Sequence, residues 1–182
     1  MPRHEGQVIH LHELSLEERR VHDGQAQQHW YRHVAPIVAG RMVVDVGAGS
    51  GYGMDILREA GASVTGLDPL PLREDVIHSD HTALAVWSCD YVVAMDVIEH
   101  VEDDVGFLAI LLGAARIGVF VSTPNWDISH CVNPHHIREY TLDELLGIIH
   151  GRRYDGWSSD GQCQISLGLD PALSNFGVMI YR

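Results

Sequence analysis

A run of glycines follows a short apolar segment in the first third of the chain. It has the spacing G-x-G-x-G-x-G from Gly47 to Gly53 and comes directly after Met42–Val46. Glycine lets the backbone turn sharply and approach a ligand closely, and turns that follow parallel strands are places where ligands bind. The dinucleotide fingerprint G-x-G-x-x-G would require its third glycine at position 52, where this chain has Tyr52. The run therefore predicts a ligand site that differs from a standard dinucleotide site.

Two acidic residues belong to the same predicted site. Asp45 lies in the apolar segment just before the glycines, and Asp68 ends the next apolar segment. An acid beside the glycines repels a pyrophosphate and attracts a cationic ligand. An acid at the position of Asp68 accepts hydrogen bonds from a ribose diol. Together the glycines and the two acids predict a nucleoside ligand that carries no phosphates.

A second group of polar residues has the composition of a metal or acid–base site. Asp96, Glu99 and His100 are close in the sequence, and His136 lies in a later polar stretch. Residues three and four apart meet on one side of a helical turn, so these groups and one histidine from a loop could form a mixed oxygen and nitrogen site for a divalent ion. Alternatively, His100 or His136 acts as a general base without a metal. A third interpretation is that the segment only supports the pocket and the start of a helix.

The elements that position these residues alternate between short apolar runs and helical patterns. Strands are expected at 42–46, 63–67, 75–78, 91–95, 117–122, 163–167 and 176–181, and helices at 15–38, 51–60, 103–113 and 142–150. Such alternation predicts an α/β fold of the Rossmann-like, doubly wound type, with a mostly parallel sheet and helices on both faces. The last two expected strands have little chain between them, so we expect them to pair antiparallel at one edge of the sheet.

The glycine segment resembles motif I of the class I methyltransferases that depend on S-adenosylmethionine (SAM). Gly66-Leu67-Asp68 is similar to the acid of their second strand, and Ser79-Asp80-His81 resembles the turn after their third strand. The likeness covers residues 40–125. It implies a SAM site whose residues are Asp45, Gly47, Ala48, Gly49, Gly51, Asp68, Pro69, Asp80, His81 and Asp96. Because the chain between Asp68 and Asp80 is short, the usual second helix should be very short or absent.

The second group also resembles a known pattern. The segment from Asp96 to His100, the Ser122-Thr123-Pro124-Asn125 segment and the later His136 are together similar to small-RNA 2′-O-methyltransferases. The first part is shared with ubiquinone-biosynthesis O-methyltransferases. The resemblance implies that Asp96, Glu99, His100 and His136 bind Mg²⁺ or another divalent metal, with His100 and His136 as the candidate catalytic residues. Asp96 departs from the pattern because its side chain is one methylene shorter than glutamate.

The length of 182 residues fits one domain. We expect an N-terminal helical segment at 1–38, a SAM-binding core at 40–125, a lid loop at 125–140, and a C-terminal helix with edge strands at 141–182. The first residues lack the apolar run of a signal peptide, and the most apolar stretch is better explained by a helix followed by a strand than by a membrane span. A cytoplasmic location is the expectation.

The charge balance bears on the partners of the chain. Lysine and arginine number 12 against 25 aspartates and glutamates, a net charge of −13, which argues against a nucleic-acid partner without excluding a local basic patch. We therefore expect methyl transfer from SAM to an oxygen or nitrogen of a small-molecule, saccharide or lipid-like acceptor. The alternatives are metal-assisted 2′-O-methylation of RNA, SAM binding without catalysis, and a nicotinamide-dependent oxidoreductase. Whether the chain forms a homodimer is open.

Overall fold

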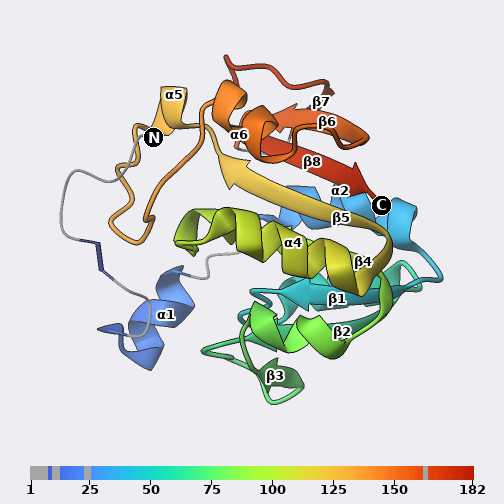
Figure 1. The fold of residues 1–182 in the computed structure, drawn as a ribbon. Coiled ribbons are helices and arrows are strands. Elements are labelled where there is room, and N and C mark those ends of the chain that lie inside the picture. Colours follow the sequence, from blue (N-terminus) through green and yellow to red (C-terminus); the bar gives the residue numbers. More distant parts are fainter. Residues whose placement is uncertain (1–7, 10–12, 23–25, 162–163) are drawn as a thin grey trace.

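The sheet at the centre of the molecule has eight strands in the order β3-β2-β1-β4-β5-β8-β6-β7. The computed structural model describes residues 8–9, 13–22, 26–161 and 164–182. The strands are β1 Met42–Val46, β2 Ser63–Asp68, β3 Val76–His78, β4 Cys89–Met95, β5 Ala115–Pro124, β6 Tyr154–Ser159, β7 Ile165–Leu167 and β8 Asn175–Tyr181. The first five are parallel to one another, and β8, β6 and β7 add antiparallel pairs beyond β5. Figure 1 shows β5 and β8 side by side.

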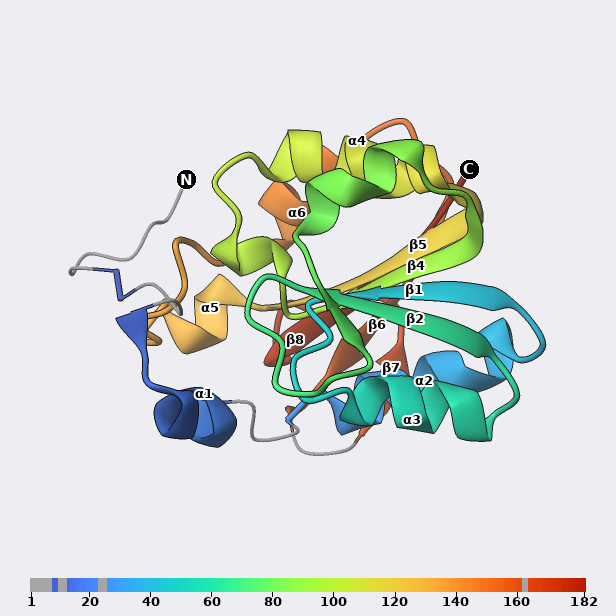
Figure 2. The ribbon, with the colours of Figure 1, turned by 90° about the horizontal axis from the view of Figure 1, so that it is seen from below.

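Helices cover both faces of this sheet. They are α1 Leu16–His22, α2 Gln28–Val38, α3 Tyr52–Glu59, α4 Asp104–Ala114, α5 Trp126–Ser129 and α6 Leu142–Ile148. In Figure 2, α2 and α3 lie on one face and α4 and α6 on the other. This arrangement confirms the predicted Rossmann-like fold with an antiparallel edge. Among the described helices, none is long and apolar enough to span a membrane.

The apolar core has two halves, one on each side of the sheet. Strand β4 shows why, because its side chains alternate between the faces. Val92 and Ala94 pack in the half that includes α4, whereas Val93 and Met95 pack against Trp30 of α2 and other residues of the second half. A strand buried on both faces is nearly continuously apolar, which is why this segment was easily recognised in the sequence.

Three expectations about the elements are wrong. The helix expected at 15–38 is two helices, since α1 ends at His22 and α2 starts at Gln28; the sequence between them contains Gly24, and glycine disfavours a helix interior. The two last expected strands do not pair with each other, because β6 lies between β7 and β8. Strand β6 itself was not expected, since its sequence, YDGWSS, has little apolar alternation. Cys163, placed in a strand from the sequence, is outside the described residues.

The chain between β2 and β3 contains no helix in the described structure, as the short spacing predicted. Ionic contacts hold this connection instead. Arg73 contacts Asp55 of α3 and Asp75, and Arg58 of α3 also contacts Asp75 at 2.8 Å. The amide of Leu72 donates a hydrogen bond to the Gly49 carbonyl at 3.1 Å. The connection is therefore fastened both to α3 and to the glycine turn.

Candidate functional site

A pocket of about 440 Å³ lies where β1, β2 and β4 end at their carboxyl termini. Its size falls within the range of about 300–1,000 Å³ that is usual for small-ligand sites. Seven of the ten residues predicted to bind the cofactor line it, namely Gly47, Gly49, Asp68, Pro69, Asp80, His81 and Asp96. Asp45, Ala48 and Gly51 are outside this lining. The pocket thus joins the two groups of residues that the sequence singled out.

The glycine turn needs its glycines for conformation and for space. Gly47 and Gly51 have φ angles of +77° and +75°, which side-chain-bearing residues rarely adopt. A Cβ atom on Gly47 would lie 2.5 Å from a methyl carbon of Val97. The amides of Gly47 and Ala48 both donate to the Leu67 carbonyl, at 2.9 and 3.1 Å. The turn is therefore fixed against the end of β2.

Asp68 fastens the glycine turn to the connection that follows β2. Its Oδ2 accepts a hydrogen bond from the Gly49 amide at 2.9 Å, and its Oδ1 accepts one from the Leu70 amide at 2.7 Å. A carboxylate has about four acceptor positions. Asp68 thus holds the turn from a position in the lining of the pocket.

Asp45 and Asp80 have different surroundings from Asp68. Asp45 is fully buried, and the Tyr31 hydroxyl of α2 donates to its two oxygens at 3.0 and 3.2 Å. Asp80 caps the 3₁₀ helix His81–Val86, accepting a hydrogen bond from the Thr82 amide at 2.9 Å. The Thr82 contacts lower the pKa of Asp80. Asp45 thus links α2 to β1 beneath the pocket, while Asp80 stays charged at its wall.

Asp96 stands at the end of β4 in a strained conformation, with φ at +52°. Its carboxylate accepts hydrogen bonds from the Ser122 hydroxyl at 2.5 Å and from the Gln27 amide group at 3.2 Å. Gln27 in turn accepts a hydrogen bond from the Tyr52 hydroxyl at 2.7 Å. Burial raises the pKa of Asp96. Such strain is maintained only where the surroundings enforce it, and it is frequent at functional sites.

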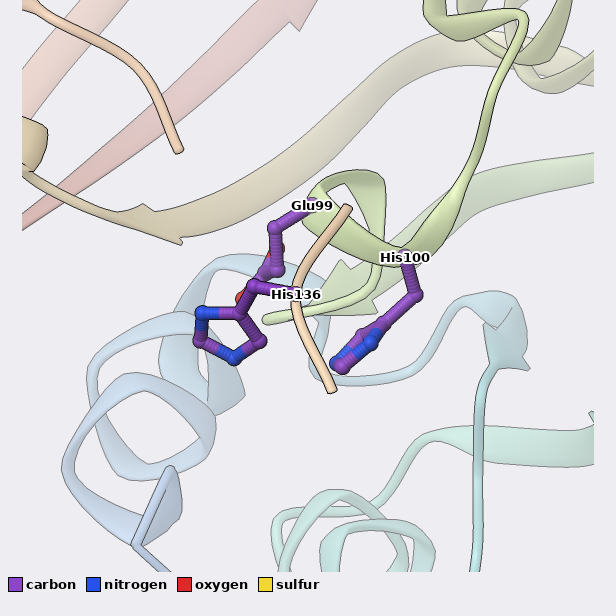
Figure 3. Close-up of side chains that lie close together, drawn as sticks. All are labelled: Glu99, His100 and His136. Carbon is purple, nitrogen blue, oxygen red and sulfur yellow. The ribbon is translucent and has the colours of Figure 1, made fainter. Parts of the chain in front are cut away.

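Glu99, His100 and His136 come together beside the pocket (Figure 3). One potential ligand atom from each lies within 4.8 Å of the others. The His100 and His136 rings are 4.9 Å apart between centroids and nearly perpendicular. The amide of Ile137 donates to the Glu99 carbonyl at 2.9 Å, so a main-chain bond joins the two segments that supply these side chains.

Glu99 is the least satisfied polar group of this cluster. It is fully buried on the 3₁₀ helix Ile98–His100. Its Oε2 accepts a hydrogen bond from the Thr123 hydroxyl at 3.3 Å, and its Oε1 has no partner among the described residues. Burial, followed by the nearby carboxylates of Asp96 and Glu139, raises the pKa of Glu99 well above its ordinary value. A proton or a cation at this place would relieve an unfavourable arrangement.

The cluster contains three of the four residues predicted as metal ligands. The carboxylate of Asp96, the fourth, is instead bonded to Ser122 and Gln27. Gln27, Tyr31 and Glu139 are not among the predicted site residues, although all three contact them. Only Glu139 had a local signal, since it follows His136 by three residues. Gln27 precedes α2 as its N-cap and Tyr31 lies within α2, which is remote from these residues in the sequence.

Comparisons with known proteins agree with this geometry. Residues 21–148 match the model of a family described as a methyltransferase domain. A probable S-adenosylmethionine-dependent methyltransferase of Mycolicibacterium smegmatis is 32% identical over 156 residues, covering 66% of this chain and 60% of the relative. A ubiquinone biosynthesis O-methyltransferase of Methylobacterium sp. is 35% identical over 106 residues, which cover 48% of this chain. The match therefore covers less than two thirds of the length of either relative, 60% of the first and 43% of the second.

The fold is also similar to a solved structure. Magnesium protoporphyrin IX methyltransferase from Synechocystis PCC 6803, with S-adenosylhomocysteine bound, superposes with a TM-score of 0.59. The match covers 98% of this chain and 90% of that one at 17% sequence identity. At this identity the similarity establishes the fold alone.

Proposed function

The chain belongs to the family of methyltransferase domains, and from that premise we propose that it transfers a methyl group from SAM to an oxygen of a small-molecule acceptor. One observation carries the proposal: the pocket is lined by the glycine turn and Asp68 and also by Asp96 and His100. The first set suits a nucleoside, and the second offers an acid–base group. A binding site and a group for proton transfer therefore share one cavity.

The residues that line the pocket fit the chemistry of SAM. Asp68 lines the pocket as an acceptor suited to the ribose diol, and Asp80 and His81 also line it and would face the adenine. SAM supplies a methyl group bound to a positively charged sulfur. Asp96, in the pocket, and the fully buried Asp45 nearby form an acidic environment for that charge.

The proposed reaction is a direct displacement. The acceptor oxygen forms a bond to the methyl carbon while the carbon–sulfur bond breaks, and its proton passes to an imidazole. S-Adenosylhomocysteine leaves as a neutral thioether. His100 and His136 are the available bases, and a positioned base typically contributes about 10²–10⁴-fold to the rate. The pocket contributes the alignment of the two reactants, which is the larger share in such reactions.

We further propose that Glu99, His100 and His136 bind a divalent cation. The supporting observation is the buried Oε1 of Glu99 without a partner among the described residues. Two imidazoles and a carboxylate suit a transition metal or zinc. Such an ion would lower the pKa of an acceptor hydroxyl. Elemental analysis of purified protein tests this: bound metal in the native chain and its loss in Glu99→Gln are expected, and an equal, negligible content in both contradicts it.

Oxygen rather than nitrogen is the proposed acceptor atom. The relative from Methylobacterium is named an O-methyltransferase. RNA is the less favoured acceptor, because the net charge of −13 opposes the approach of a polyanion. Saccharides and lipid-like alcohols remain within the proposed class, since each presents a hydroxyl group.

A matched pair of acceptors tests the proposal. Protein is incubated with SAM labelled in the methyl group and with either a catechol or the corresponding diamine. We expect label in the catechol product and little in the diamine. His150→Asn serves as the control variant, since this exposed histidine at the end of α6 is outside the pocket. Transfer to the diamine alone would overturn the choice of oxygen, and transfer to none of a broad panel of alcohols, phenols and amines would contradict a catalytic role.

A further inference from the structure

Glu139 is a buried acid whose role the proposed reaction leaves unexplained. It lies before α6, is 2% exposed, and follows His136 by three residues. Burying a carboxylate is unfavourable unless donors surround it. Glu139 has three such partners: the His136 ring, the Cys131 amide and the Ser129 hydroxyl. All three belong to the stretch from α5 to His136.

The contacts of Glu139 determine which nitrogen of His136 carries the proton. Oε2 of Glu139 accepts a hydrogen bond from the Cys131 amide at 3.0 Å and contacts the Ser129 hydroxyl. Oε1 lies 2.5 Å from Nδ1 of His136. An ionised carboxylate can only accept hydrogen bonds. Nδ1 of His136 must therefore be the protonated nitrogen.

The other side of the ring independently indicates the same tautomer. The Oδ1 atom of Asn133 accepts a hydrogen bond from the His135 amide at 3.0 Å. The amide nitrogen of Asn133 consequently faces Nε2 of His136, at 3.0 Å, and donates to it. Nε2 must then be the unprotonated nitrogen, whose lone pair accepts this bond. The hydroxyl group of a bound methyl acceptor can replace this amide as the donor to Nε2. One hydrogen bond is then exchanged for another.

The backbone is distorted in favour of this arrangement. His130 and Cys131 are consecutive residues with φ angles of +51° and +52°, a conformation that is unfavourable for side-chain-bearing residues. Their turn brings the Cys131 amide to the Glu139 carboxylate. Strain of this kind persists only where the surroundings enforce it.

We propose that Glu139 is a positioning residue that holds His136 as the Nδ1-protonated tautomer, so that Nε2 is the nitrogen that can exchange its bond from Asn133 for the proton of the methyl acceptor or for a cation. Carboxylates perform this task behind histidines that bind metals. The catalytic value of this arrangement rests on the proposed function, whereas the tautomer itself does not.

The substitution Glu139→Gln should invert the tautomer. The Cys131 amide is a fixed donor, so the glutamine oxygen turns to it and the glutamine amide group turns to Nδ1 of His136. Nδ1 then accepts, and the ring proton moves to Nε2, which requires the Asn133 amide group to give up its bond to Nε2. Glu144→Gln is the matched control, because Glu144 also bonds a hydroxyl and a backbone amide, those of Thr141, in the first turn of α6.

Nitrogen-15 NMR of histidine-labelled, metal-free protein distinguishes the two tautomers directly. The His136 signals are assigned by their absence in His136→Asn. We expect the Nδ1-protonated pattern in the native protein and in Glu144→Gln, and the Nε2-protonated pattern in Glu139→Gln. An Nε2-protonated His136 in the native protein would overturn the proposal, as would an unchanged tautomer in folded Glu139→Gln. The native spectrum decides the matter even if that variant does not fold.

The kinetic consequence is measured separately. Glu139→Gln should lower kcat by about 10–100-fold while the KM for SAM stays unchanged, and Glu144→Gln should change neither. The expected tautomers without any methyl transfer by the native chain would refute the proposed function and leave the positioning role intact. The expected tautomers with full activity in Glu139→Gln would refute the positioning role in catalysis.

Discussion

Two regions at the pocket are constructed differently: the glycine turn with Asp68, called the nucleoside end, and the cluster of Glu99, His100 and His136 with Glu139, called the transfer end. At the nucleoside end, main-chain amides fix the glycine turn, and the acid that matters, Asp68, lies partly exposed at its wall. At the transfer end, buried side chains from separate segments meet: Glu139 bonds His136, and Glu99 bonds Thr123 through Oε2 while its Oε1 has no partner among the described residues. The first end is set by backbone conformation and the second by the pairing of buried polar groups. Changes at the first should affect binding, and changes at the second should affect turnover.

The largest expected effect is at the transfer end. His136→Asn removes one of the two proposed bases while preserving the approximate size and the polarity of the side chain. We expect kcat to fall by about 10²–10⁴-fold with the affinity for S-adenosylhomocysteine unchanged. Steady-state kinetics and calorimetric titration measure the two quantities. Equal losses in both would show that the two ends are not separable.

An intermediate effect is expected at the nucleoside end. Asp68→Asn replaces one acceptor oxygen with a donor, which then faces the amide of Gly49 or Leu70. Hydrogen bonds to charged groups contribute about 1.5–3 kcal/mol, so the dissociation constant of S-adenosylhomocysteine should rise roughly 10- to 150-fold. Asp90→Asn is the control, because Asp90 lies at the start of β4, away from the carboxyl ends of the strands where the pocket lies. An unchanged constant in Asp68→Asn would remove Asp68 from the ligand site.

The smallest expected effect concerns the ionic contacts that replace the missing helix. Arg73 and then Arg58 lower the pKa of Asp75 far below its ordinary value. A lowered carboxyl pKa stabilises the folded state above the unfolded pKa, and this stabilisation is lost as pH falls below about 4. Arg73→Met should therefore reduce the dependence of unfolding on pH in this range. It should also weaken the binding of S-adenosylhomocysteine about twofold to fivefold. Added salt should cause a similar loss of affinity in the native protein, because it screens the same ionic contacts. An identical acid profile in variant and native protein would contradict the role of these contacts.

The difference between the ends also explains what the sequence could predict. The glycines, Asp68 and the strands that carry them are adjacent along the chain, so their spacing was sufficient to predict the fold and the family, and both predictions are confirmed. The transfer end depends on contacts between segments. The bond of Tyr31 to buried Asp45 and that of Gln27 to Asp96 arise because α2 packs against the sheet, and no local pattern encodes them. Strand β6 was missed because pairing with β7 and β8, rather than apolar alternation, makes it a strand.

The most direct measurement is a calorimetric titration of the native chain with S-adenosylhomocysteine. The structure predicts saturable binding at one site per chain, lost or strongly weakened in Asp68→Asn and retained in His136→Asn. Thermal unfolding gives a second reading, since ligand at 100 times its dissociation constant stabilises the folded state by about 2.7 kcal/mol. Absence of heat and of any thermal shift at millimolar ligand would contradict the central claim that this pocket binds SAM.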